Sequence, residues 1–227
     1  MEHEVHRRYL RRKAFIFAVL FALAVLFWSS VELQKIFYDF ILFSSRYLDE
    51  QKFLGAVFFL AVSALSAVLS PFSSVPFLPV FTVIWGNVLT VALLLLGWLL
   101  GGVASYFLGS LTGYSLAKKL FPPEKVEYYK QEISTRTKFP IVLLFRLAMP
   151  TEIAGYVLGS VKYSFIKYLI ITALAETPFA FIAVYSSEAL IEANKANFVF
   201  LIFLLSLIIA AAFFLFKRIH KNNLLKS

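Results

Sequence analysis

An arginine and a glutamate lie in an otherwise uncharged apolar stretch, residues 141–159, which reads IVLLFRLAMPTEIAGYVLG. Arg146 and Glu152 flank Pro150 in this stretch. A charged side chain at bilayer depth costs about 2.5–3.5 kcal/mol, and a proline inside an apolar helix frees backbone groups that lipid cannot satisfy. Because folding alone requires none of these features, their combination indicates a polar site inside a membrane protein.

Arg146 suits anion recognition, because a guanidinium is always charged and can hold a phosphate through two parallel hydrogen bonds. The structural alternatives are an ion pair with Glu152 or Glu176, or a side chain that reaches toward the cytoplasm. Glu152 follows Pro150 in the expected first turn of a helix, where the helix dipole favours an acid. Capping and proton carriage by Glu152 both stay open at this point.

Glu176 lies two residues before Pro178 in the apolar sequence ITALAETPFAFIAVY. No lysine lies within a helical turn of Glu176, so its partner must come from another element, and Arg146 is the obvious choice. Tyr156 is four residues after Glu152, on the same face of a helix, and can hydrogen-bond that residue or a ligand. We therefore expect Arg146, Glu152, Glu176 and Tyr156 to form a substrate-binding or transport site.

The composition places the chain in a membrane. Of its 227 residues, 60% are hydrophobic, and the mean hydropathy is +0.80, as in polytopic membrane proteins. Cysteine is absent, and the three histidines lie near the chain ends, so we expect no catalytic residue, metal or cofactor. The net charge of +9 comes from basic residues beside apolar segments, which predicts cytoplasmic N- and C-termini and no nucleic-acid binding.

The proline pattern predicts two re-entrant hairpins. Residues 53–69 run into PFSSVPFLP, where Pro71, Pro76 and Pro79 occur without a charge nearby. Such backbone is tolerated at membrane depth only where protein or a water-filled cavity surrounds it. Residues 140–159 repeat the pattern around Pro150, as expected of an inverted repeat with a site at the midplane. The predicted fold is all-α, with these two opposed hairpins and four transmembrane helices at residues 14–31, 88–116, 165–185 and 198–216.

Small residues recur at every fourth position of the second predicted transmembrane helix. This spacing places them on one stripe, where another backbone can approach closely. The stripe fits packing within one chain or between two copies, so a homo-oligomer stays open. The residues of this ladder are Gly97, Gly101, Ser105, Gly109 and Gly113, and Gly155 and Gly159 lie on the return arm of the second hairpin.

The chain resembles the DedA/VTT superfamily, also called the SNARE-associated Golgi protein family, over about residues 53–185. The resemblance rests on VPFLPVFTVIWGNVL, GWLLGGVASYFLGSLTGYSLAKKL and FPIVLLFRLAMPTEIAGYVLGSVKYSFIKYLIITALAETP. It implies two opposed hairpins that meet at the membrane centre, with Arg146 as the hairpin arginine. It also implies translocation of phospholipids or of undecaprenyl phosphate, with proton coupling proposed. Glu152 stands where bacterial members generally carry a second arginine, so a eukaryote-like branch fits as well.

The sequence thus predicts an integral protein of the cytoplasmic membrane in three parts. Residues 1–52 form a basic tail, the first transmembrane helix and an outer segment, residues 53–186 the core with both hairpins, and residues 187–227 the last helix and a basic tail. The expected function is non-enzymatic, flippase- or scramblase-like transport of lipids through their anionic headgroup phosphate, with protons as a further partner. A proton- or cation-coupled antiporter for small solutes and a non-transporting assembly factor are the alternatives.

Overall fold

The computed structural model describes residues 31–69, 73–112, 138–149 and 151–224, and the regular elements in these residues are all helices. The chain forms two compact units, Met1–Arg46 and Tyr47–Ser227, and the second contains the site described below. The elements are α2 (Val31–Asp49), α3 (Lys52–Val68), the short 3-10 helix η1 (Val75–Phe77), α4 (Leu78–Thr112), α7 (Phe139–Ala148), α8 (Thr151–Ser160), α9 (Phe165–Ile191) and α10 (Lys195–Leu224).

Three helical stretches of the described residues are long and apolar enough to cross a membrane: Val75–Thr112, Phe165–Ile191 and Lys195–Ala212. They contain most of the second, third and fourth predicted transmembrane helices, and they confirm an all-α membrane protein in this part of the chain. The first predicted transmembrane helix lies outside the described residues except for Val31. The expected outer segment that follows it is largely helix α2.

Helix α4 is bent sharply at Gly86. The backbone angles there are φ 72° and ψ 175°, in a region that glycine adopts readily because it lacks a Cβ atom. The bend separates a short arm, residues 78–85, from a long arm, residues 87–112. The long arm measures about 39 Å at the rise of an α-helix, which is enough to cross a hydrocarbon core of about 30 Å.

The chain reverses direction twice between α3 and the long arm of α4. A Cβ atom added at Gly97 would overlap the side chain of Ser63, and further along, Ser105 Oγ donates a hydrogen bond to the Ala67 carbonyl at 2.9 Å. Residue numbers therefore rise together along both helices, so α3 and the long arm run in the same direction. The described residues of the connection, 73–85, run back the other way, since Ser74 contacts Trp98 and Phe81 contacts Phe59.

Helix α8 lies against the C-terminal half of the long arm. A Cβ atom added at Gly155 would lie 2.7 Å from Ser105 Cβ, and one added at Gly159 would lie 3.1 Å from the Ser110 nitrogen. Both distances are shorter than ordinary van der Waals contact, so the two backbones touch. Because the contacts advance together, α8 runs in the same direction as the long arm and ends beside its C-terminal end.

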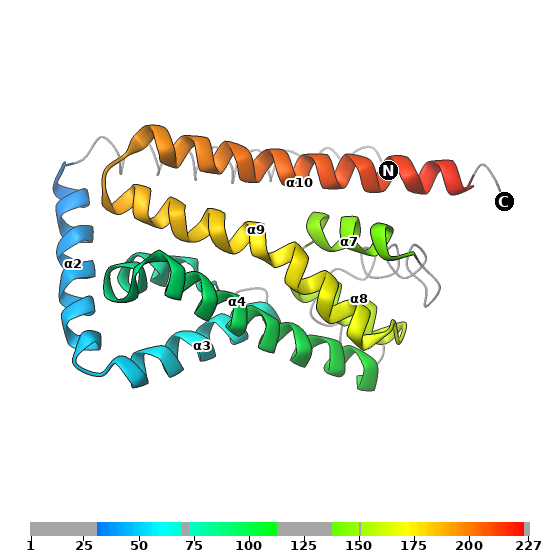
Figure 1. Cartoon of the computed structure of the whole chain (residues 1–227), viewed down its shortest axis with the longest axis horizontal. Coiled ribbons are helices and arrows are strands. Elements are labelled where there is room, and N and C mark those ends of the chain that lie inside the picture. The colour runs from blue at the N-terminus through cyan, green and yellow to red at the C-terminus, as the bar shows by residue number, and fades with distance from the viewer. Residues whose placement is uncertain (1–30, 70–72, 113–137, 150, 225–227) are drawn as a thin grey trace, which may run out of the picture. The chain divides into compact units, whose positions relative to one another are not determined.

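Two buried clusters form the core, and α9 contributes to both. Tyr168 and Ile171 pack with residues of α4, α7 and α8, whereas Ala180 and Val184 pack with residues of α3 and α4. Pro178 lies inside α9, between these two groups. Helix α9 also contacts α10, which follows it along the chain and runs back beside it (Figure 1). Helices α4 and α9 therefore both connect the parts of the core.

Candidate functional site

Arg146 and Glu176 form a buried ion pair between α7 and α9. Nη2 of Arg146 donates a hydrogen bond to Oε1 of Glu176, and each residue is only 2% exposed. Taking two charges out of water is costly unless each satisfies the other. The structure thus brings together two of the four predicted site residues, and Glu176 has the partner that the sequence suggested.

The local sequence explains where Arg146 lies. A proline disfavours the helical conformation in the residue before it, and Met149 has an extended backbone with φ −114° and ψ 146°. Helix α7 therefore ends at Ala148, which places Arg146 in its last turn, where the negative end of the helix dipole favours a cation. The predicted interruption at Pro150 is confirmed, because α7 and α8 are separate helices.

Glu176 belongs to a buried stripe on α9 together with Tyr168 and Thr172, each four residues apart. The Tyr168 hydroxyl donates a hydrogen bond to the Gly102 carbonyl at 2.8 Å. A Cβ atom added at Gly102 or at Gly155 would lie 3.1 or 3.2 Å from that hydroxyl oxygen. The two glycines therefore leave the room that the hydroxyl occupies, at the junction of α4, α8 and α9.

Tyr168 and Thr172 were not among the predicted site residues. Their spacing from Glu176 is visible in the sequence, since residues four apart lie on one face of a helix. Polar residues aligned with an intramembrane acid on an otherwise apolar helix are a signal that would have identified both.

One hydrogen-bond donor of the Arg146 guanidinium has no partner among the described residues. Its Nε atom is buried and makes no hydrogen bond with the residues that the structure describes. Leaving such a donor unsatisfied costs about 1–3 kcal/mol, and more for a charged group. The site can therefore accept a hydrogen bond acceptor at Arg146 beyond the carboxylate of Glu176.

Tyr156 connects α8 with the end of α3. The residue is buried, and its hydroxyl donates a long hydrogen bond of 3.4 Å to the Val68 carbonyl. The carbonyl oxygen of Tyr156 lies where a side chain at Gly109 would have to be placed. Tyr156 thus contacts both the long arm of α4 and the last residue of α3.

Some of the remaining predicted residues lie in described helices, and others lie outside the described residues. Glu152 lies in the first turn of α8, and its side chain is outside the described part of the structure. Pro76 is the second residue of η1, Pro79 lies in the first turn of α4, and Pro178 lies inside α9. Outside the described residues are Pro71, Gly113 and Pro150.

The described glycines of the ladder contact two different helices. A Cβ atom added at Gly97 or Gly101 would overlap atoms of α3, and one added at Gly109 would overlap the backbone of α8. The long arm of α4 therefore uses its small residues to hold two other helices of the same chain. A homo-oligomer stays a prediction.

The site offers charged and hydroxyl groups. Among the described residues, no group of three or more histidine, cysteine, aspartate or glutamate side chains could hold a metal ion. The chemistry available is that of a buried guanidinium, its carboxylate partner and the neighbouring hydroxyl groups.

More than half of the chain matches a known protein family. The family model of the VTT domain matches residues 70–189, which is more than half of the chain and includes both Arg146 and Glu176. No curated protein and no solved structure matches the chain. Since the match covers the kinked helix, the interrupted α7–α8 segment and the ion pair, the chain belongs to the VTT-domain family of membrane proteins, the DedA or SNARE-associated Golgi protein family.

Proposed function

We propose that this protein moves phosphate-bearing lipids across the bilayer, with Arg146 binding the headgroup phosphate. The observation that carries the proposal is the buried Arg146–Glu176 pair, whose Nε donor has no partner among the described residues. Guanidinium and phosphate form two parallel, charge-assisted hydrogen bonds, which are among the strongest in proteins. Membership of a membrane-protein family supports a transport role over enzymatic chemistry.

The charges of the pair indicate how lipid binding is balanced. In the empty site the positive Arg146 and the negative Glu176 cancel. A phosphodiester bound to Arg146 leaves Glu176 as an uncompensated buried anion, and breaking a buried pair in this way costs about 3–5 kcal/mol. A proton taken up by Glu176 restores neutrality. In this proposal one proton therefore accompanies each lipid phosphate.

The course of the backbone supports a re-entrant pathway. Ala67, near the end of α3, is level with Ser105, and Ser74 on the returning segment accepts a hydrogen bond from Trp98 Nε1 at 3.2 Å. The Trp98 contact falls near the middle of residues 87–112, and the Ser105 contact falls in their last third. Since Gly155 also faces Ser105, α8 begins near the same level. We infer that the two interrupted segments meet at half depth, where broken backbone can line a polar cavity.

The test is lipid movement in liposomes that contain the purified protein. Wild-type protein should equilibrate a fluorescent phospholipid between the leaflets, and Arg146→Ala should slow this at least about tenfold, because one charge-assisted contact is worth about 1.5–3 kcal/mol. Lys167→Ala is the matched control, since it removes an exposed basic residue from α9 and should leave the rate unchanged.

The rival functions predict different results. An Arg146→Ala protein that inserts normally and moves lipid at the wild-type rate would contradict the proposal. Solute flux that follows a pH gradient without lipid movement would instead identify an antiporter. If wild-type protein moves neither, the assembly-factor alternative gains support.

A further inference from the structure

Thr172 is a buried polar residue one helical turn before Glu176 on α9. The residue is 1% exposed, and its Oγ1 atom makes no hydrogen bond with the residues that the structure describes. Such a hydroxyl group loses its hydrogen bonds to water on burial and regains none, which destabilises the fold. Four other buried hydroxyl groups of the described residues share this lack of a partner, and Thr172 is the one within a helical turn of Glu176. The four belong to Ser63, Thr82, Ser186 and Ser187.

Thr172 does not use the hydrogen-bond acceptor that its own helix offers. A threonine hydroxyl inside a helix can donate to the carbonyl four residues earlier, as Thr177 of the same helix does at 2.7 Å. For Thr172 that carbonyl belongs to Tyr168, and Oγ1 forms no such bond. A Cβ atom added at Gly102 would lie 3.5 Å from Thr172 Cγ2. The methyl group of Thr172 therefore faces α4, and its hydroxyl group points in another direction.

The ion pair and this hydroxyl group belong to one site. Thr172 and Glu176 lie on one face of α9, and Arg146 binds the Glu176 carboxylate. The Tyr168 hydroxyl lies near Thr172 and near both charges of the pair. It donates its own proton to the Gly102 carbonyl. Because the Nε donor of Arg146 also has no partner among the described residues, the site contains two unused donors, one on α7 and one on α9.

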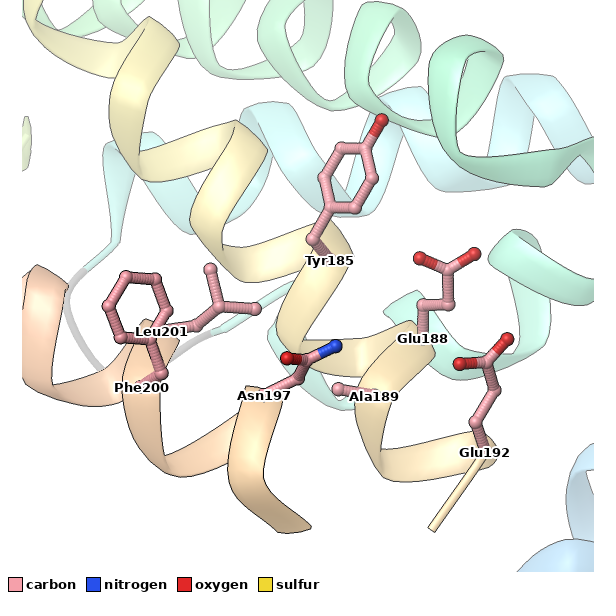
Figure 2. Close-up of a pocket in the computed structure, with 7 residues that line it drawn as sticks. All are labelled: Tyr185, Glu188, Ala189, Glu192, Asn197, Phe200 and Leu201. Atoms are coloured by element: carbon pink, nitrogen blue, oxygen red, sulfur yellow. The ribbon is translucent and has the colours of Figure 1, made fainter. Parts of the chain in front are cut away.

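Polar side chains at the other end of α9 have access to water. Figure 2 shows Glu188, Glu192 and Asn197, which line a groove between α9 and α10. Glu188 is only partly buried, and Glu192 and Asn197 are exposed, so water can satisfy their polar atoms. Thr172 lacks this access. Since buried polar groups are nearly always hydrogen-bonded, its hydroxyl group needs an occupant of the site.

The two unused donors indicate the chemistry of that occupant. A guanidinium N–H can only donate, so the occupant must present an acceptor to Arg146. A phosphate has several acceptor oxygens in tetrahedral directions, and it can accept from Arg146 and from Thr172 at the same time. The Glu176 carboxylate accepts from Arg146 but receives no hydrogen bond from Thr172. A phosphate therefore gains a contact that the resident carboxylate does not make.

We propose that the Thr172 hydroxyl donates a hydrogen bond to the phosphate that Arg146 binds, which makes Thr172 a second binding residue of the site. This inference rests on the proposed function and adds a group from α9 to it. The additional hydrogen bond favours the phosphate over Glu176 in the competition for Arg146. The same chemistry applies to a lipid headgroup phosphate and to inorganic phosphate.

The experiment tests the hydroxyl and methyl groups of Thr172 separately. Thr172→Val retains the shape of the side chain and removes the hydroxyl, whereas Thr172→Ser retains the hydroxyl and removes the methyl group. The full-length protein in nanodiscs is titrated with inorganic phosphate, and in liposomes the movement of fluorescent phosphatidylglycerol is followed. Thr172→Val should weaken binding and slow movement at least about tenfold, the size expected of one hydrogen bond to a charged group. Thr172→Ser should keep most of both.

Thermal unfolding separates a binding role from a structural one. Because valine replaces a buried hydroxyl that has no partner, the melting temperature of Thr172→Val should equal or exceed that of the wild-type protein. A lower melting temperature would show that the hydroxyl has a structural partner and would overturn the proposal. Thr177→Val is the matched control, since it makes the same change on the same helix at an exposed hydroxyl that binds its own backbone. It should change neither phosphate binding nor lipid movement.

The two probes distinguish this proposal from the proposed function. If Thr172→Val binds phosphate and moves lipid as the wild-type protein does, the hydroxyl holds only a buried water molecule. The proposal for Thr172 is then overturned, and lipid transport stands. If wild-type protein moves no lipid but binds inorganic phosphate through Arg146 and Thr172, lipid transport falls and the site binds free phosphate. If it neither binds phosphate nor moves lipid, both proposals are overturned.

Discussion

Arg146 and Glu176 each neutralise the buried charge of the other. Both side chains are almost fully removed from solvent, and an unpaired charge in such a position is among the largest single sources of destabilisation in proteins. A well-packed apolar pair of similar volume is often as stable as a buried ion pair. Retaining two charges where apolar residues would serve therefore favours a role in binding over a role in folding.

This reasoning predicts opposite effects of single and double substitutions. Glu176→Ala leaves Arg146 charged and unpaired, so the free energy of unfolding should fall by about 3–5 kcal/mol. The double variant Arg146→Met/Glu176→Met should recover most of that loss, because it removes both charges together. Denaturation of the detergent-solubilised variants measures the stabilities.

Transport should behave differently from stability in the same two variants. Both lack the paired guanidinium and carboxylate, so lipid movement in liposomes should be lost in both. A double variant that is stable and still moves lipid would show that the pair is only structural.

At this scale the sequence revealed the charged residues and their pairing but not their surroundings. Arg146 and Glu176 are conspicuous because charge is rare in apolar segments. The sequence shows that Tyr168 lies on the helix face of Glu176, but it does not show what the Tyr168 hydroxyl contacts. The Tyr168 hydroxyl fits between α4 and α8 because Gly102 and Gly155, from these two helices, lie beside it. This contact depends on the tertiary structure and cannot be read from the sequence.

Helix contacts in this protein depend on individual glycines, for two different physical reasons. At Gly159, on α8, an added Cβ atom would overlap the Tyr106 carbonyl of α4. At Gly86 an added Cβ atom would meet nothing within 4 Å, but φ is 72°. The first position needs glycine for space, and the second needs it for backbone conformation.

Three alanine substitutions test whether Gly159 is needed for space and Gly86 for backbone conformation. Gly159→Ala should lower the free energy of unfolding by about 1–3 kcal/mol through overpacking, and Gly86→Ala by about 1–3 kcal/mol through backbone strain. Gly55→Ala, on α3, is the control. Its Cβ atom would lie 3.6 Å from the Trp85 ring, an ordinary contact, and alanine favours a helix by about 1 kcal/mol. Equal losses at all three positions would contradict the assignment.

The sequence predicted the helices better than their ends and bends. A helix beginning near residue 88 and an interruption at Pro150 follow from apolar length and proline chemistry. The bend at Gly86 does not, because a glycine within a long apolar run is equally compatible with a straight helix. Helix α9 continues to Ile191, past the polar residues Ser186, Ser187 and Glu188, because tertiary packing outweighs local polarity there.

For the whole molecule, the direction of α8 leads to a test of topology. If α7 and α8 enter the membrane and return to the same face, Lys138 and Ala196 lie on opposite sides, since α9 alone separates them. If α7 and α8 together crossed the bilayer, both residues would lie on the same side. The chain contains no cysteine, so each introduced cysteine is a unique label.

We expect Ala196→Cys to react with a membrane-impermeant maleimide added outside intact cells, and Lys138→Cys to react only after permeabilisation. Both positions are exposed, so the difference reports the side of the membrane and not burial. Ser206→Cys, within the apolar part of α10, should stay unlabelled from either side. Labelling of both test positions from the same side would exclude the re-entrant arrangement.

Pro178 gives α9 a mechanical property that follows from its place between the two buried clusters. Proline has no backbone N–H, so the carbonyl of Leu174, four residues earlier, lacks its helical hydrogen bond, and the helix is weakest there. Glu176 lies at this weak point, one half of α9 is fixed to α7 and α8, and the other half is fixed to α3. The ion pair therefore lies at the point of α9 that its own backbone hydrogen bonds hold least, between the parts of the helix that pack in the two clusters.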